Sequence, residues 1–266
     1  MNTGKVLTLA ASLVLVLATA SCKTEYQKVL ESADTDQKYD LAFSLFNEGK
    51  YAKAAQVFES VSLALQGTER DDTVQYYWGL CNYRANDYIT AETNFKNFLE
   101  HYPRSSFASE AKFYRIDCLY RATYRYELDQ TPTYTAMTAI SEYMLENPES
   151  AHYPTANLML KELGARLDRK AYENAKLYYK MEDYRAAGVA LRNVLKDDAE
   201  NIYREDILYY TAMASYKYAD MSVESKQKER FIQFQDDYYN FIGEYPESKY
   251  RAELDRLMKK VKGIEK

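Results

Sequence analysis

The residue best placed to do chemistry in this sequence is Cys22, which follows a short apolar segment and a run of small residues. Lys5 supplies a positive charge near the N-terminus, and residues 6–17 are apolar apart from Thr8 and Ser12. An apolar run of this length is typical of a secretory signal peptide, because a membrane-spanning helix needs about 20 residues. A cysteine directly after small residues is the lipobox arrangement. In it the thiol receives diacylglycerol, the peptide is cut before the cysteine, and the new amine is acylated. The sequence therefore predicts lipid attachment at Cys22.

One position departs from the usual lipobox. Thr19 stands three residues before Cys22, where leucine is usual, so a plain secretory signal cut after Ala20 or Ser21 is the alternative. In either case the remaining chain folds outside the cytoplasmic membrane. Lys23 follows the cysteine, and in the best-known sorting rule an aspartate at that place retains a lipoprotein in the inner membrane. Lys23 is therefore compatible with transfer to the outer membrane.

The composition favours a helical protein without a nucleic-acid partner. The 266 residues carry 35 basic and 40 acidic side chains, a net charge of −5, and no basic stripe that would follow a phosphate backbone. Only 8 glycines and 5 prolines interrupt the chain, which suits long helices. The length allows one elongated domain or two small ones. The 28 tyrosines suit surfaces that are half buried and half solvated, because tyrosine has an apolar body and a polar tip.

Side chains that could form a catalytic or metal site are few. The only histidines are His101 and His152, and no spacing of histidine, cysteine and carboxylate predicts a metal site or a nucleophile with its base. We therefore expect neither an enzyme nor a bound cofactor or metal. Cys81 and Cys118 lie inside apolar helical patterns, which favours two buried free thiols, with a disulfide as the alternative in an oxidising compartment.

A repeated frame runs through the chain. The pattern Pro-x-Ser occurs at Pro103, Pro148 and Pro246, and large apolar residues stand eight and five positions before each proline. A small residue stands twelve positions before the first two prolines. Five segments fit this frame, two of them without the proline: Ala54, Phe58 and Val61; Ala91, Phe95 and Phe98; Ala136, Ile140 and Tyr143; Ala187, Leu191 and Val194, with Ala199 in place of proline; and Phe234, Tyr238 and Phe241.

This spacing has a helical cause. Offsets of four and seven residues place the three side chains on one helix face, and the small first residue lets a neighbouring helix approach closely. Proline then ends the helix. Short turns precede the frame at residues 49–51, 86–88 and 182–184, and each follows another helical segment, at 38–47, 74–85 and 171–181. The sequence therefore predicts an all-α protein, a tetratricopeptide-repeat α-solenoid of about five helix–turn–helix units.

The repeats divide the chain into four parts. Residues 1–21 form the signal peptide, 22–35 a lipid-anchored linker, 36–150 units 1–3 and 151–266 units 4–5. We also expect a loop over residues 125–132 between the helices of the third unit, an insertion over 219–229 in the fifth, and a helix over 151–167 that continues into the fourth unit.

Several stretches extend the resemblance from repeats to a family. They are the segment from Cys22 to Leu30 that leads from the anchor into the first unit, Gly67–Glu69, Leu128–Thr131, Ser225–Arg230, and the FIGEYPESKY run from Phe241. With the Pro-x-Ser repeats, the lipobox cysteine and this length, the mature chain resembles the BamD family of outer-membrane assembly lipoproteins. The departure is Ala199, where the family often has proline.

The resemblance implies a function and a binding surface. It implies a lipid-anchored periplasmic scaffold at the outer membrane, whose N-terminal units bind unfolded outer-membrane protein clients and whose C-terminal units contact the BamA barrel subunit. By repeat position the first helix of each unit lines the groove, and aromatic residues with interleaved arginines suit a peptide that ends in an aromatic residue and a carboxylate. The alternative for each tyrosine is packing between helices. The groove candidates are Tyr39, Phe43, Asn47, Tyr76, Tyr83, Arg84, Phe113, Asp117, Tyr120 and Arg121.

A different envelope adaptor is the alternative function. Tol–Pal-associated or peptidoglycan-associated lipoproteins use the same kind of repeat. The known relative of that type carries a coiled coil before its repeats. Here the repeats begin shortly after Cys22, which leaves no room for such a segment.

Overall fold

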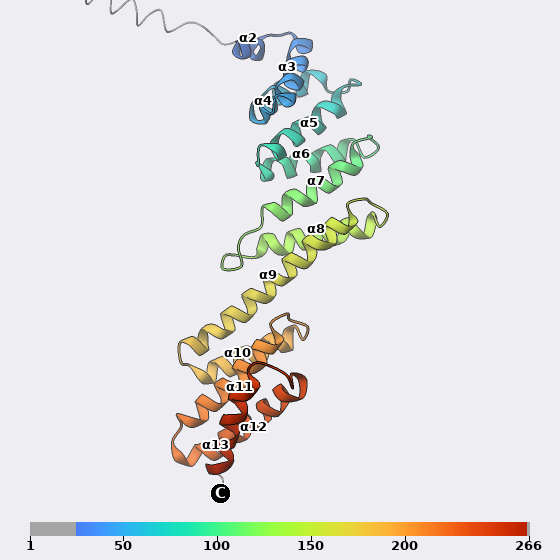
Figure 1. Cartoon of the computed structure of the whole chain (residues 1–266). Coiled ribbons are helices and arrows are strands. Elements are labelled where there is room, and N and C mark those ends of the chain that lie inside the picture. The colour runs from blue at the N-terminus through green and yellow to red at the C-terminus, as the bar shows by residue number, and fades with distance from the viewer. Residues whose placement is uncertain (1–24, 265–266) are drawn as a thin grey trace, which may run out of the picture. The chain divides into compact units, whose positions relative to one another are not determined.

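The computed structural model describes residues 25–264, which form helices joined by turns and contain no strand. The chain divides into two compact units, residues 1–122 and 123–266. The first unit contains α2 (Glu25–Glu31), α3 (Thr35–Asn47), α4 (Tyr51–Leu65), α5 (Asp71–Arg84), α6 (Tyr88–His101) and α7 (Ala108–Arg121) (Figure 1). Each of these helices packs against the next along the chain, and α5 also contacts α7.

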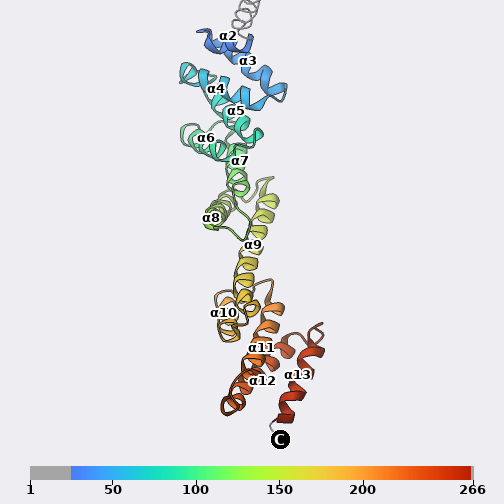
Figure 2. The ribbon, with the colours of Figure 1, turned by 90° about the vertical axis from the view of Figure 1, so that its left-hand side faces the viewer.

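The second unit contains α8 (Thr131–Glu146), α9 (Tyr153–Lys180), α10 (Tyr184–Asp197), α11 (Arg204–Asp220), α12 (Glu224–Glu244) and α13 (Arg251–Ile264). Successive helices again pack together, and α9 contacts α11 as α11 contacts α13. Figure 2 shows α13 alongside α11 and α12. No helix between residues 25 and 264 is both long and apolar enough to cross a membrane.

Packing of each helix against its successor and against the next but one is the arrangement of tetratricopeptide repeats. The predicted all-α, tetratricopeptide-like class is therefore confirmed within each unit. The boundary between the compact units falls between α7 and α8, so it separates the two helices of the third predicted repeat. The predicted boundary between residues 150 and 151 is based on the number of repeats, and it stays a prediction.

The turns inside three helix pairs share one geometry. Gly49, Asn86 and Glu182 have φ values of 75°, 64° and 62° and follow the ends of α3, α5 and α9. The next N–H in each case bonds back to a carbonyl five residues earlier, as from Asp87 to Asn82 at 2.9 Å. This is a Schellman-type helix end, which satisfies free carbonyls at the cost of a left-handed residue. The same kind of turn therefore joins the two helices of each of these three pairs.

In two of the Pro-x-Ser motifs the serine hydroxyl bonds to a carboxylate at the start of an earlier helix. The Ser105 hydroxyl donates to Asp72 at 2.7 Å and accepts from the Phe107 N–H at 3.2 Å. Ser248 likewise donates to Glu205 at 2.6 Å and accepts from a backbone N–H two residues later. Each serine therefore ties the loop after one hairpin to the first turn of that hairpin's first helix. It also accepts from the backbone N–H of the residue just before the next helix, which fixes the turn there.

In the fourth segment, which has Ala199 in place of proline, an asparagine amide takes the place of the serine. Asn201 stands two residues after Ala199, as serine stands two after proline, and its side-chain oxygen accepts from the Tyr203 N–H at 3.0 Å. Helix α10 still ends at Asp197, before Ala199. Proline is therefore not needed to end this helix, because the Asn201 turn supplies the break.

The interior of both units is built by the predicted frame. Its leading alanines at 54, 91, 136 and 187 are fully buried, as are Phe58, Phe95, Leu191 and Phe234. Cys81 and Cys118 are buried free thiols, and burial raises the pKa of each to about 12, so both stay protonated at neutral pH.

The predicted helix over 151–167 is confirmed as the first half of α9. The predicted insertion over 219–229 is wrong in extent. Helix α11 runs to Asp220 and α12 begins at Glu224, because polar side chains continue a helix as readily as apolar ones.

Replacement of Ala91 or Ala187 by leucine is expected to lower the free energy of unfolding by about 1–3 kcal/mol, because neither fully buried site has room for three more carbons. Trp78, the single tryptophan, lies on α5 and reports unfolding of the first unit for Ala91→Leu. Circular dichroism serves for Ala187→Leu. The exposed helical positions Ala52 and Ala252 are matched controls and should accept leucine without loss. Equal stability of buried and exposed variants would contradict the assigned register.

Candidate peptide-binding surface of the N-terminal unit

The ten groove candidates all lie in the first unit, on the first helix of each repeat. Helix α3 carries three of them, α5 three and α7 four. Their burial divides them into groups with different roles. Asn47, Arg84 and Arg121 are exposed, whereas Tyr39, Phe43, Tyr83, Phe113 and Tyr120 are half-buried.

Tyr76 and Asp117 are corrections to the predicted surface, because both are buried. Tyr76 is 6 % exposed and its ring stacks on Phe107 with centroids 4.4 Å apart. Asp117 is 2 % exposed. Neither side chain is open to a ligand in this structure. The helical period placed Tyr76 correctly on α5, but Phe107, in the loop between α6 and α7, covers its ring.

Phe43 and Tyr39 form an aromatic edge at the start of the unit. The Phe43 ring lies 4.8 Å from Tyr39 and 4.8 Å from Tyr77, and 5.1 Å from the buried Phe58. Phe43 therefore mainly packs. The repeat positions did not single out Arg70, whose guanidinium lies 4.8 Å over the Tyr39 ring and pairs with Asp36 at 2.7 Å. The Arg70 guanidinium therefore covers this aromatic edge through a cation–π contact with Tyr39.

Asp117 is the centre of a polar cluster between α5 and α7. The Tyr83 hydroxyl and the Arg121 Nε both donate to its Oδ2, the latter at 2.6 Å. The Arg121 guanidinium also lies 5.6 Å from the Tyr83 ring and 5.5 Å from the Tyr88 ring. Burial and the bond to Asp117 raise the pKa of Tyr83, and the same carboxylate raises the pKa of Arg121. Tyr83 therefore stays a hydrogen-bond donor and Arg121 stays charged.

Arg84 and Arg121 occupy the last position of their helices but differ in their partners. Arg121 has Asp117 one turn earlier, whereas the residue one turn before Arg84 is Leu80. Among the residues that the structure describes, Arg84 forms no hydrogen bond or ion pair. A carboxylate ligand would therefore meet an unpaired cation at Arg84 and an already neutralised one at Arg121.

Cys22, the predicted lipid-attachment residue, lies outside the described residues. The described chain begins with α2, a single helix of 7 residues before the first repeat. The part of the structure from residue 25 to α3 thus contains no coiled-coil segment of the kind that an alternative adaptor would carry.

A family model described as an outer membrane lipoprotein, YfiO, matches residues 31–230, which is more than half of the chain. The chain belongs to the YfiO family. This is the BamD family that the repeats and lipobox indicated. Membership in the YfiO family places the protein at the outer membrane as a lipoprotein, and the family consists of non-catalytic assembly lipoproteins.

Two further comparisons add little to this assignment. No curated protein matches the sequence. A crystal structure of a TPR repeats protein from Bacteroides fragilis NCTC 9343 is 14 % identical and covers 88 % of this chain and 100 % of its own, with a TM-score of 0.40. At that similarity the helical arrangement rests on the contacts described above.

Proposed function

We propose that this YfiO-family lipoprotein is the lipid-anchored periplasmic scaffold of an outer-membrane β-barrel assembly machinery. It binds unfolded outer-membrane protein clients and a BamA-type barrel subunit. The observation that carries the proposal is the family match over residues 31–230. Client binding in the first unit is supported by the unpaired Arg84 at the end of α5 and by the cluster of Tyr83, Asp117 and Arg121.

Two properties of this surface suit an extended peptide with a C-terminal carboxylate. Arg84 offers an unpaired charged donor at the end of α5. The half-buried aromatic residues of α3, α5 and α7 offer rings that can contact a terminal aromatic side chain. The second unit would then hold the periplasmic part of the barrel subunit.

A peptide copied from the C-terminus of an outer-membrane barrel is expected to bind the full chain. Arg84→Ala should weaken this binding by about 1.5–3 kcal/mol, the value of a hydrogen bond to a charged group. Arg121→Ala should weaken it less, because Asp117 already pairs with that guanidinium. Isothermal calorimetry measures both, with Arg104→Ala in the loop before α7 as a control and the C-terminal amide of the peptide as a ligand control.

Co-purification from detergent-solubilised envelope separates the proposal from its alternative. Recovery of a barrel protein with this chain would support the assembly machinery. Unchanged peptide binding in both arginine variants would remove this surface from the mechanism. Absence of peptide binding together with absence of a co-purified barrel would favour a Tol–Pal-type or peptidoglycan-linked adaptor.

A further inference from the structure

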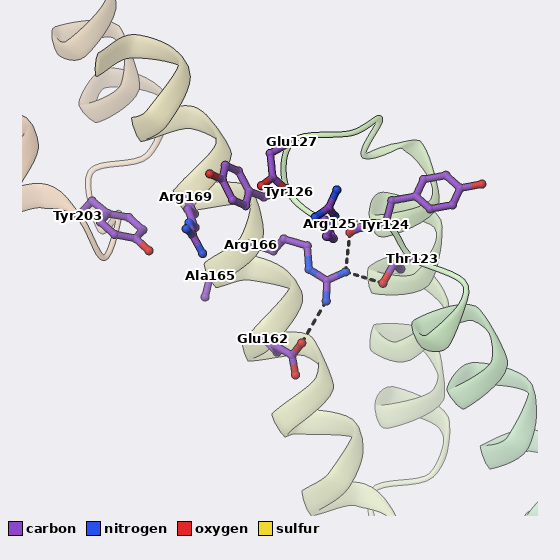
Figure 3. Close-up of a pocket in the computed structure, with 10 residues that line it drawn as sticks. All are labelled: Thr123, Tyr124, Arg125, Tyr126, Glu127, Glu162, Ala165, Arg166, Arg169 and Tyr203. Carbon is purple, nitrogen blue, oxygen red and sulfur yellow. Dashed lines mark hydrogen bonds and ion pairs between the residues drawn. The ribbon is translucent and has the colours of Figure 1, made fainter. Parts of the chain in front are cut away.

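A short connection in the second unit is held rigidly against α9. Residues 123–130, here called the strap, precede α8. Arg166 of α9 donates to the Thr123 hydroxyl at 2.5 Å and to the Tyr124 carbonyl at 2.9 Å (Figure 3). Lys170, one turn further on, donates to the carbonyls of Tyr126 at 3.0 Å and Leu128 at 2.8 Å.

Gln130, the last residue of the strap, completes this attachment. Gln130 is 5 % exposed, and its side-chain amide donates to the carbonyls of Arg125 at 2.9 Å and Leu128 at 3.0 Å. Five strap carbonyls, those of residues 124–128, therefore receive hydrogen bonds from three side chains. A segment fixed in this way presents its own side chains in set positions, which lowers the entropic cost of binding.

A pocket of about 520 Å³ opens between the strap and α9. Its volume is in the range of sites that hold small ligands or peptide side chains. Tyr124, Tyr126 and Tyr203 line it together with Arg125 and Arg169. Figure 3 shows the strap arginine and the α9 arginines around the same opening.

The arginines of the pocket are not equally available. Arg166 is occupied by the strap and by Glu162, which lies 3.0 Å from its Nη2. Arg169 lies over the Tyr126 ring at 4.2 Å, and Arg125 is exposed on the strap. Within residues 25–264 neither Arg125 nor Arg169 forms an ion pair or a hydrogen bond. The lining also contains Glu127 and Glu162, so three arginines face two carboxylates, and Glu162 already pairs with Arg166.

We propose that this pocket binds an acidic segment of a polypeptide partner. Arg125 and Arg169 receive aspartate or glutamate carboxylates, because guanidinium matches the planar carboxylate with paired N–H donors. An apolar side chain next to the acid packs on the tyrosine rings. Tyr124 and Leu128, each 50 % exposed, continue an apolar surface beyond the pocket that a free anion would not use. The inference goes beyond the proposed function and concerns a different unit of the chain.

The experiment uses the full chain in detergent and a fluorescent peptide of alternating aspartate and leucine, blocked at both ends. Its twin has asparagine in place of aspartate. Fluorescence anisotropy should show binding of the aspartate peptide only. The double variant Arg125→Gln/Arg169→Gln should bind it at least about tenfold more weakly, the loss expected for one charged hydrogen bond. Affinity should also fall as salt rises.

Matched variants separate the pocket from general charge and from folding. Arg256→Gln removes an exposed arginine of α13 in the same unit and should leave binding unchanged. Lys170→Met should weaken binding and raise hydrogen exchange in residues 123–130, because the strap loses three of its bonds. Circular dichroism of each variant checks the helical content, and a variant that unfolds is replaced by Arg169→Lys, which should recover part of the affinity.

Three results would overturn the proposal. Equal binding of the aspartate and asparagine peptides would show that carboxylates are not recognised. Unchanged affinity in the double variant would place the peptide elsewhere. Displacement of the peptide by inorganic phosphate or by anionic phospholipid vesicles at lower concentrations than by free glutamate would identify a phosphate site instead.

Discussion

Replacement of Cys22 by serine is expected to move the protein from the membrane fraction to the soluble fraction when its partners are absent. A single acyl chain gives only marginal membrane binding, whereas two or more chains anchor a protein stably. Acylation at Cys22 would supply the two chains of diacylglycerol and a third on the amine. A serine at position 22 would not receive these acyl chains. Fractionation and intact mass measure the result.

Thr19→Leu is the matched control for the anchor. It restores the usual residue three positions before the cysteine and should leave the protein acylated and in the membrane fraction. A Cys22→Ser protein that stays with membranes in a host without its partners would contradict lipid attachment. The plain secretory alternative would then predict a mature chain beginning after Ala20 or Ser21, without added lipid mass.

Removal of the Asp117 carboxylate is expected to destabilise the first unit by about 2–3 kcal/mol. Asp117→Ala deletes the acceptor of two hydrogen bonds at a buried position, one from the Tyr83 hydroxyl and one from the charged Arg121 side chain. Tyr83 then loses its partner while its ring stays half-buried. Arg121 regains water, because its side chain is 44 % exposed, which limits the loss. Urea unfolding followed by Trp78 fluorescence reports on this unit.

Asp36→Ala is the matched control for burial. Asp36 also pairs with an arginine in the first unit, but its side chain is 80 % exposed. Exposed ion pairs contribute little to stability, so the unfolding midpoint of this variant should not change measurably. Asp117→Asn keeps one acceptor and loses the charge, and should fall between wild type and Asp117→Ala. Equal stability of Asp117→Ala and Asp36→Ala would show that the cluster around Asp117 does not stabilise the unit.

Local sequence patterns are enough to predict the helical repeat and its apolar face. Alanine, a large apolar residue four positions on and another at seven define one side of a helix, and these side chains are buried. The turns at Gly49, Asn86 and Glu182 were also predicted, because glycine and polar residues end helices. Each of these features depends on neighbours within about a dozen residues. The lipobox and the family resemblance are likewise local patterns.

The tertiary structure alone decided which polar side chains are satisfied and which remain available. Tyr76 is on the predicted helix but is covered by Phe107 of the loop between α6 and α7. The Tyr83 hydroxyl meets Asp117 34 residues later, and the bonds from Arg166 and Lys170 reach the strap from more than 40 residues away. The period of a helix gives the face of a residue but not its partner, because the partner comes from another helix whose distance and angle depend on packing. Arg121 pairs with Asp117 on its own helix, but the Tyr83 hydroxyl that shares this carboxylate comes from α5.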